Sequence, residues 1–206
     1  MLFSDPDVRR ELGGTNGGNN WSNDLFAQKI DRFADNNNVH GCSIIAHSQG
    51  GLAALHLYTY YWSCLDNVGS GRLIQSVGSP YQGTPLAGNL AAIGDVFGAG
   101  CGVQNDLTTS GAAYWLSYIP SWARGRVNYY TTTFTDVWWR YDYCNLATDA
   151  FLGDPEDGVV ENGRGQLPGG LNRGAKVGWC HSTDMRDPAQ YTDGGRNAEM
   201  NSLAAL

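Results

Sequence analysis

The sequence predicts an α/β fold, with a mostly parallel β-sheet and helices on both faces. Two short apolar runs, Cys42–Ala46 and Leu73–Gly78, are expected to be buried strands. Between them, apolar residues follow helical spacing from Gly50 to about Cys64. A strand, a helix and a strand within about 40 residues form a βαβ unit, and such a unit has parallel strands.

Further segments complete the expected framework. Apolar residues at helical spacing predict a helix from Asn23 to Ala34, capped by Ser22 or by Asn23 itself. No linker or internal repeat divides the chain, so we expect residues 1–206 to form one domain. The other strand candidates are Thr131–Phe134 and Lys176–Trp179.

The stretch from about residue 86 to residue 150 lacks a regular pattern and is rich in tryptophan and tyrosine. We interpret it as an irregular insertion or cap region within the domain. Most of its aromatic side chains are expected to build the core. The candidates for exposure are Trp115, Trp122 or Trp138, and the region could also line an acyl pocket, form a lid or contact an apolar polymer.

Charge and hydropathy argue against two classes of partner. Of the 206 residues, 20 are acidic and 13 basic, which gives a net charge of −7. Without a cluster of lysine and arginine, such a chain is a poor electrostatic match for nucleic acid or anionic lipid. A membrane span needs about 18 consecutive apolar residues. The best candidate for one is interrupted by Asn89 and Asp95.

Five cysteines bear on the compartment in which the chain functions. Cys42 lies in an apolar run and is interpreted as a buried thiol. The other four lie in or beside Gly- and Asn-rich segments, and we prefer the pairs Cys64–Cys101 and Cys144–Cys180, although four cysteines allow three pairings. Disulfides favour an extracellular or periplasmic location. The first residues hold no apolar signal core, so any signal peptide is expected to be absent from this chain.

The most specific signal is the segment Ala46-His47-Ser48-Gln49-Gly50-Gly51, between the first expected strand and the helix that follows it. A tight strand-to-helix turn holds a serine in a strained backbone conformation and exposes its hydroxyl for nucleophilic attack. The residues two before and two after the serine must be small, as Ala46 and Gly50 are. The Gln49 amide, in the first helical turn, is expected to point toward a developing oxyanion.

This A-x-S-x-G segment resembles the nucleophile elbow of α/β-hydrolases, and its alanine is similar to that of one branch of small bacterial lipases. Gly14–Asn20 resembles the approach to the elbow in that same branch, and Val77–Pro85 resembles the segment after the next strand in bacterial triacylglycerol lipases. The resemblance is strong over about residues 10–90 and weaker over residues 150–187. It implies the α/β-hydrolase fold and carboxylic ester hydrolysis by a Ser–Asp–His triad through an acyl-enzyme.

The order of serine, acid and histidine along such chains selects the base. Of the four histidines, only His181 lies far C-terminal to the motif. His40, His47 and His56 lie before the motif, within it and on the helix behind it, and are expected to be structural or solvent-facing. We therefore assign His181 as the base.

The acid is selected by a second resemblance. Gly153–Val160 resembles the acid loop of bacterial lipases, in which Asp-Gly and an apolar pair carry the triad acid. Residue by residue this selects Asp157, with Asp154 as the reserve candidate. In the implied mechanism, His181 takes the Ser48 proton, Asp157 orients the imidazole and the Gln49 amide holds the oxyanion.

The chain departs from the family pattern before the motif. Only 47 residues precede Ser48, and they lack the usual N-terminal strand and the turn that supplies a second oxyanion amide. Three explanations stay open: a fragment, a donor from another loop, or a catalytically inactive hydrolase-fold binding module. Missing strands would also expose a sheet edge through which a homodimer could form.

Substrate and metal are the least determined features. The expected substrate is a lipid or a short-chain ester, and the alternative is an apolar polyester of the polyhydroxyalkanoate type. No cofactor is expected. Related lipases can hold a structural calcium near the histidine loop. Asp154, Asp184 and Asp187 are the candidate ligands here, although their spacing does not reproduce the ligand positions of the family.

Overall fold

The computed structural model describes residues 22–69, 71–87, 105–133, 148, 151–177, 181 and 194–204. Strands and helices alternate through the first part of this chain, as the expected βαβ unit requires. In chain order the elements are α2 (Asn23–Asn36), β1 (Ile44–His47), α3 (Gln49–Tyr60), β2 (Ile74–Val77), η2 (Asn105–Leu107), α5 (Thr109–Tyr118), α6 (Ser121–Arg124), β3 (Val127–Thr133), β4 (Leu171–Val177) and α8 (Gly194–Ala204).

Four parallel strands form one sheet in the order β1-β2-β3-β4. Ile44 of β1 lies opposite Ile74 of β2, and Ile74 lies opposite Val127 of β3. The carboxyl ends of these strands therefore meet at one edge, where ligand sites of parallel sheets are found. Within the described residues β1 pairs on one side only, and homodimerisation through its other side stays a prediction.

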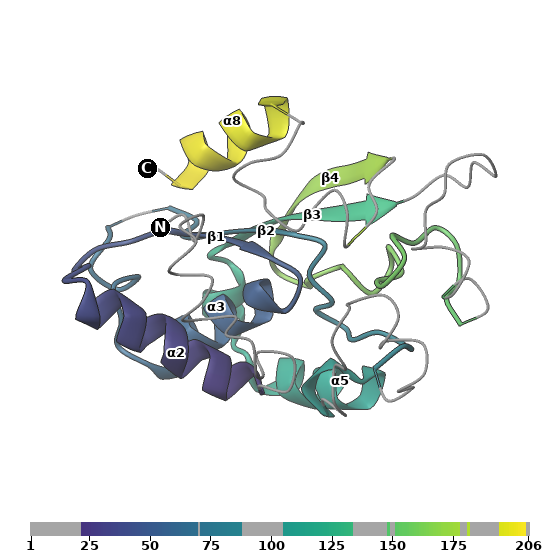
Figure 1. The fold of residues 1–206 in the computed structure, drawn as a ribbon, viewed down its shortest axis with the longest axis horizontal. Coiled ribbons are helices and arrows are strands. Elements are labelled where there is room, and N and C mark those ends of the chain that lie inside the picture. The colour runs from purple at the N-terminus through teal and green to yellow at the C-terminus, as the bar shows by residue number, and fades with distance from the viewer. Residues whose placement is uncertain are drawn as a thin grey trace.

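Helices cover both faces of the sheet, as the sequence predicted (Figure 1). α2, α3 and α5 lie on one face, and α8 lies on the other. Ile44 packs into the larger core cluster together with Leu55 of α3. Ile45, the next residue of the strand, instead contacts the cluster that contains Met200 of α8. This alternation follows from the two-residue repeat of a strand.

The expected elements are present, but some of their ends are shifted. α2 begins after Ser22, whose side-chain oxygen accepts a hydrogen bond from Leu25 N at 3.1 Å. β4 begins at Leu171, well before the expected Lys176. Its early part contains polar residues and Gly174 at a positive φ of 108°, which hide the strand pattern.

The aromatic-rich region contains more regular structure than its sequence pattern indicated. It includes η2, α5, α6 and β3, which begins at Val127 rather than at Thr131. Trp115 on α5 is buried, so exposure is wrong for this candidate. Trp122 on α6 is 57% exposed, as expected, and Trp138 lies outside the described residues.

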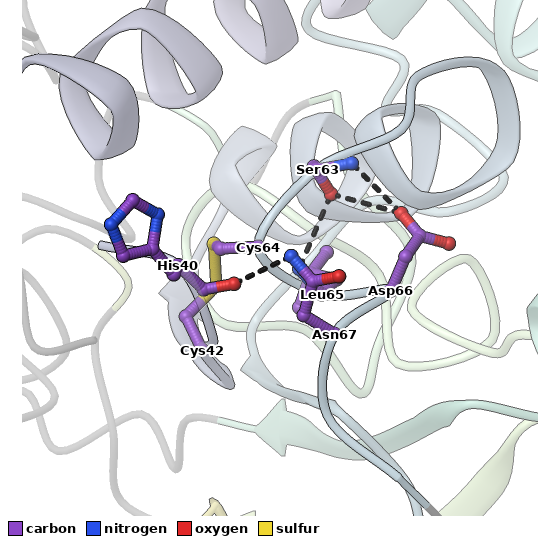
Figure 2. Close-up of a disulfide and its surroundings, with 7 residues drawn as sticks. All are labelled: His40, Cys42, Ser63, Cys64, Leu65, Asp66 and Asn67. Carbon is purple, nitrogen blue, oxygen red and sulfur yellow. Dashed lines mark hydrogen bonds between the residues drawn. A yellow bond between two sulfur atoms is a disulfide. The ribbon is translucent and has the colours of Figure 1, made fainter. Parts of the chain in front are cut away.

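The expected disulfide pairing is wrong at Cys64. Cys42 forms a disulfide with Cys64 (Figure 2), so Cys42 is not a free thiol and the pair Cys64–Cys101 is excluded. The chain after α3 returns to the start of β1, where Cys42 N donates to Cys64 O at 3.0 Å. The two Cα atoms lie 5.1 Å apart, within the normal range for a disulfide. The expected pair Cys144–Cys180 lies outside the described residues.

The turn that carries Cys64 is held by local hydrogen bonds. α3 ends at Tyr60, earlier than expected, and the extended backbone of the following residue directs the chain back toward β1. Asp66 Oδ2 accepts a hydrogen bond from Ser63 N at 2.8 Å (Figure 2). Asn67 Nδ2 donates to the carbonyl oxygen of His40 at 2.6 Å. The side chain of His40 is exposed, as expected.

Candidate active site

Ser48 occupies the turn between β1 and α3, at the carboxyl edge of the sheet. Its backbone has φ 55° and ψ −133°, a region that side-chain-bearing residues rarely adopt. Ser48 N donates to Val77 O at the end of β2 at 3.1 Å, which holds the strained turn against the sheet. The Ser48 side chain makes no capping hydrogen bond to α3. The hydroxyl therefore remains available to other partners.

Small residues around the turn allow this close packing. A Cβ added at Gly50 would meet the Cβ of Ala46 at 3.5 Å, an ordinary van der Waals contact. A Cβ at Gly51 would meet Ser79 Oγ at 2.2 Å and Tyr81 Oη at 2.9 Å, both too close. The tightest steric constraint on the turn therefore falls at Gly51.

Three side chains far apart in the sequence meet at this turn. His181 Nε2 lies 2.8 Å from Ser48 Oγ. On the other side of the ring, His181 Nδ1 lies 3.0 Å from Asp157 Oδ2. The backbone amide of His181 also donates to the carbonyl oxygen of Asp157 at 2.7 Å. The side chains of Asp157 and His181 are both fully buried.

Both oxygens of the Asp157 carboxylate accept hydrogen bonds from its surroundings. Oδ1 accepts from Val159 N at 3.0 Å and from Val160 N at 2.7 Å. Oδ2 accepts from the hydroxyl of Thr132, near the end of β3. Since the carboxylate acts as an acceptor throughout, the adjoining Nδ1 of His181 carries the proton and donates. The lone pair of Nε2 then faces the Ser48 hydroxyl, as a general base requires.

The two carboxylate candidates occupy different environments. Asp157 is completely buried beside His181, whereas Asp154 is exposed at the surface of the same loop. Thr132 was not singled out in the sequence. It lies 25 residues from Asp157 along the chain, and only strand β3 brings its hydroxyl to the carboxylate.

Gln49 begins α3, directly after Ser48. Its backbone amide therefore belongs to the first turn of the helix, where amides carry partial positive charge. The Gln49 side chain donates from Nε2 to Asn23 Oδ1 at 3.3 Å, and Asn23 is fully buried at the start of α2. This contact ties the residue that follows Ser48 to a second helix.

His47 lies closer to the site than its expected structural role suggested. Its ring centroid is 4.6 Å from that of His181, with the two rings tilted by 44°. His47 is the last residue of β1, and its position directly before Ser48 is the signal that could have suggested this contact.

His56 belongs to a separate polar cluster between α2, α3 and α5. Its Nε2 lies 3.2 Å from Asp24 Oδ1, and its Nδ1 accepts from Trp115 Nε1 at 3.1 Å. Burial lowers the pKa of His56 from its ordinary value, and the neighbouring carboxylate only partly offsets this. The pKa of Asp24 is also lowered, chiefly by the hydrogen bond that it accepts from Tyr61 Oη at 2.5 Å. The expectation that His56 is structural therefore fits its contacts.

Within the described residues, no group of three or more His, Cys, Asp or Glu side chains is arranged to hold a metal ion. The calcium candidates Asp184 and Asp187 lie outside these residues, so the metal expectation is not decided. No described helix is long and apolar enough to cross a membrane.

Residues 15–204 match the model of a protein family described as the conditioned medium factor C-terminal domain. The chain belongs to this family. It is 49% identical over 185 residues to conditioned medium factor of Dictyostelium discoideum, an alignment that covers 89% of this chain and 26% of that protein. The chain thus spans about a quarter of the length of the curated relative that it matches.

Solved structures place this member of the conditioned medium factor C-terminal domain family in the α/β-hydrolase fold. The mature form of a Bacillus licheniformis lipase matches with a TM-score of 0.59 and 16% identity, over 88% of this chain and 73% of that chain. A metagenomic carboxyl esterase matches with a TM-score of 0.57 and 21% identity, over 88% and 59% of the two chains. At these identities the likeness shows the fold, as the sequence predicted.

Proposed function

We propose that this chain is a serine carboxylic ester hydrolase in which Ser48, His181 and Asp157 act as the catalytic triad. The observation that supports this most directly is the continuous set of contacts from Ser48 Oγ through both ring nitrogens of His181 to the Asp157 carboxylate. The strained backbone of Ser48 supports it independently, because a buried structural serine has no need of such a conformation.

The reaction proceeds through an acyl-enzyme. Ser48 Oγ attacks the ester carbonyl while His181 Nε2 takes the hydroxyl proton, and Asp157 stabilises the resulting imidazolium. The tetrahedral oxyanion accepts a hydrogen bond from the Gln49 amide. His181 then returns the proton to the departing alcohol as the C–O bond breaks. Water, activated by His181 in the same way, releases the carboxylic acid and restores Ser48.

The source of the second oxyanion donor stays open. The segment before Ser48 shows no sequence pattern for the turn that supplies this donor in the family, and residues 1–21 lie outside the described part of the chain. Loss of one donor in a comparable site costs about 10²–10³ in kcat, so the Gln49 amide alone would support slow turnover.

The proposed substrate is an apolar ester, either a lipid or a short-chain ester, and the proposed location is extracellular. The Cys42–Cys64 disulfide supports an oxidising compartment. The name of the Dictyostelium relative, conditioned medium factor, refers to the medium outside cells. Hydrolysis of an apolar polyester is the alternative within the same chemistry, and a non-catalytic binding module is the alternative outside it.

The test compares the wild type with Ser48→Ala on p-nitrophenyl butyrate, p-nitrophenyl palmitate and a polyhydroxybutyrate film. We expect Ser48→Ala to lower kcat by at least about 10³-fold, because the nucleophile is removed. Ser110→Ala, at an exposed position of α5, serves as the matched control and keeps wild-type activity. Faster hydrolysis of the butyrate ester indicates an esterase, faster hydrolysis of the palmitate ester indicates a lipase, and degradation of the film indicates a polyester depolymerase.

Covalent labelling tests the nucleophile without requiring turnover. A fluorophosphonate should react at Ser48 Oγ with loss of fluoride, adding one phosphonyl group to the wild type and to Ser110→Ala but not to Ser48→Ala. An unlabelled, inactive wild type with intact thermal unfolding would overturn the enzyme proposal and favour the binding module.

A further inference from the structure

A pocket lies between α5, α6 and the turn of residues 161–165, with a volume of about 360 Å³. Its size falls in the range of small-molecule sites. None of Ser48, Asp157 and His181 lines it. The pocket is therefore distinct from the candidate active site.

Two arginines from separate elements line this pocket. Arg124 is the last residue of α6, and Arg164 belongs to the turn of residues 161–165. The chain as a whole carries a net charge of −7 and only 13 basic residues, so two arginines on one small cavity stand out. Among the described residues that line the pocket, there is no carboxylate. Arg164 pairs with Glu161, which does not line the pocket, so Arg124 carries the positive charge that no described carboxylate pairs with.

The two guanidinium groups are only partly satisfied by the protein. Arg164 Nε lies 2.5 Å from Glu161 Oε2, which occupies one of its donor positions. Arg124 Nε is buried and has no hydrogen-bond partner within the part of the chain that the structure describes. Because Nε is closed to solvent, an anion in the pocket would contact this guanidinium through its terminal nitrogens.

The rest of the pocket wall suits a compact organic molecule. Thr109 and Ser117 of α5 contribute hydroxyl groups. Leu116 and Ala113, on the same helix, contribute an apolar surface. Gln82 closes the pocket from the segment after β2, and its backbone amide donates to Arg164 O at 2.9 Å. This last bond fixes the turn that carries the second arginine.

The pocket extends toward the edge of the sheet opposite to Ser48. Arg124 lies just before β3, and Arg126 O accepts a hydrogen bond from Ile74 N at the start of β2. Ser48 instead follows the carboxyl end of β1. A ligand held at Arg124 therefore does not occupy the ester site.

We propose that this pocket binds a small organic anion, whose carboxylate or phosphoryl oxygens contact Arg124 and Arg164 and whose compact apolar body packs against α5. Planar guanidinium groups match both kinds of oxyanion by paired hydrogen bonds. The hydroxyl of Thr109 provides a further donor for the same oxygens, whereas the Ser117 hydroxyl already donates to the carbonyl oxygen of Tyr114 at 2.6 Å. The proposal does not depend on the esterase proposal.

The test is calorimetric titration of the whole chain with benzoate and with phenylphosphonate, neither of which contains an ester bond. Benzyl alcohol serves as the neutral probe of similar shape. We expect saturable binding of at least one anion, with a Kd on the order of 1 mM or tighter, and no saturable binding of the alcohol. The stronger anion distinguishes a carboxylate site from a phosphoryl site.

Variants then locate the site. Arg124→Gln and Arg164→Gln should each weaken binding by at least about tenfold, since each removes a charge-assisted contact. Arg124→Lys keeps the charge and should lose less. Arg32→Gln, at an exposed position of α2, makes the same charge change elsewhere and should bind like the wild type.

A second variant keeps the charges and fills the space. Ala113→Phe should abolish binding while leaving thermal unfolding of the unliganded chain close to that of the wild type, because Ala113 is exposed on α5. Three results would each overturn the proposal. They are unchanged binding in both Ala113→Phe and Arg124→Gln, binding of benzyl alcohol as strong as that of the anions, and no saturable binding of any probe. Unaltered binding by Ser48→Ala is expected, and its loss would instead place the anion in the ester site.

Discussion

Replacing Asp157 by asparagine would isolate the role of one buried oxygen atom. Oδ1 of Asp157 accepts hydrogen bonds from the amides of Val159 and Val160. Oδ2 faces the hydroxyl of Thr132 and the Nδ1 atom of His181. An asparagine NH₂ group cannot replace Oδ1, since donors would then face donors. The NH₂ group must therefore take the position of Oδ2.

That orientation changes the tautomer of His181. The new NH₂ group donates to Nδ1, so the ring proton moves to Nε2, the atom 2.8 Å from Ser48 Oγ. A protonated Nε2 cannot accept the serine proton. A comparable substitution in a serine protease triad lowers kcat by about 10⁴. We expect a loss of about 10³–10⁴-fold for Asp157→Asn, with the geometry of the site retained.

The effect on stability should be much smaller than the effect on rate. The two backbone amides keep their acceptor, and the Thr132 hydroxyl can rotate to accept from the new NH₂ group. Every buried polar group around residue 157 then remains paired. We expect the free energy of unfolding to change by no more than about 2 kcal/mol, which urea titration measures.

The assay is the initial rate of p-nitrophenyl butyrate hydrolysis, combined with ¹⁵N chemical shifts of the His181 ring, which report its tautomer. Asp154→Asn is the matched control, because Asp154 is exposed in the same loop and should keep activity within about twofold of the wild type. The reasoning is refuted if Asp157→Asn keeps more than about a tenth of the wild-type kcat, or if Asp154→Asn suffers the large loss instead.

Three further predictions concern the framework of the site. Gly51→Ala should be less stable than Gly50→Ala by about 1–3 kcal/mol in urea titration, because only the Cβ at position 51 overlaps a neighbour. Replacing both Cys42 and Cys64 by alanine should lower the free energy of unfolding by about 3 kcal/mol, since their disulfide closes a loop with a sequence separation of 22. The free energy of unfolding should also fall as pH drops below about 6.5, because the unfolded chain then binds a proton that buried His56, with its lowered pKa, does not. His56→Gln should reduce that slope.

Each of these predictions has its own control. Equal stability of the Gly50→Ala and Gly51→Ala variants would contradict the steric argument. For the disulfide, a reducing agent should lower the free energy of unfolding of the wild type toward that of the double variant. If the double variant instead unfolds with the same free energy as the wild type, the bond contributes little to stability. For His56, an exposed His40→Gln variant should retain the slope, so equal slopes in the wild type and His56→Gln would contradict the burial argument.

Much of the fold could be predicted because the relevant signals are local. The βαβ unit was visible as two apolar runs around a helical repeat, and the structure contains β1, α3 and β2 at that place. The turn at Ser48 was equally predictable, since its tight geometry requires small neighbours at fixed spacing. By contrast, β4 was predicted short because Gly174 and polar residues mask a strand that is defined by pairing with β3.

The order of residues selected His181, and the resemblance of Gly153–Val160 to the acid loop of bacterial lipases selected Asp157. Neither signal could show that the two side chains meet. Their contact with Ser48 spans 133 residues of chain and exists only because parallel strands bring their following loops to one edge. The preference for Asp157 over Asp154 is a matter of burial, which differs completely between two carboxylates three residues apart.

What the sequence determined by itself is a βαβ framework and a serine on a strained turn, because both depend on side-chain size and spacing within a few residues. Only the tertiary structure decided which cysteine pairs with Cys42, since the return of the chain after α3 brings Cys64 to it. It also placed Thr132 on the carboxylate and the two arginines, Arg124 and Arg164, around one pocket. Such contacts join distant segments, and no local pattern of residues encodes them.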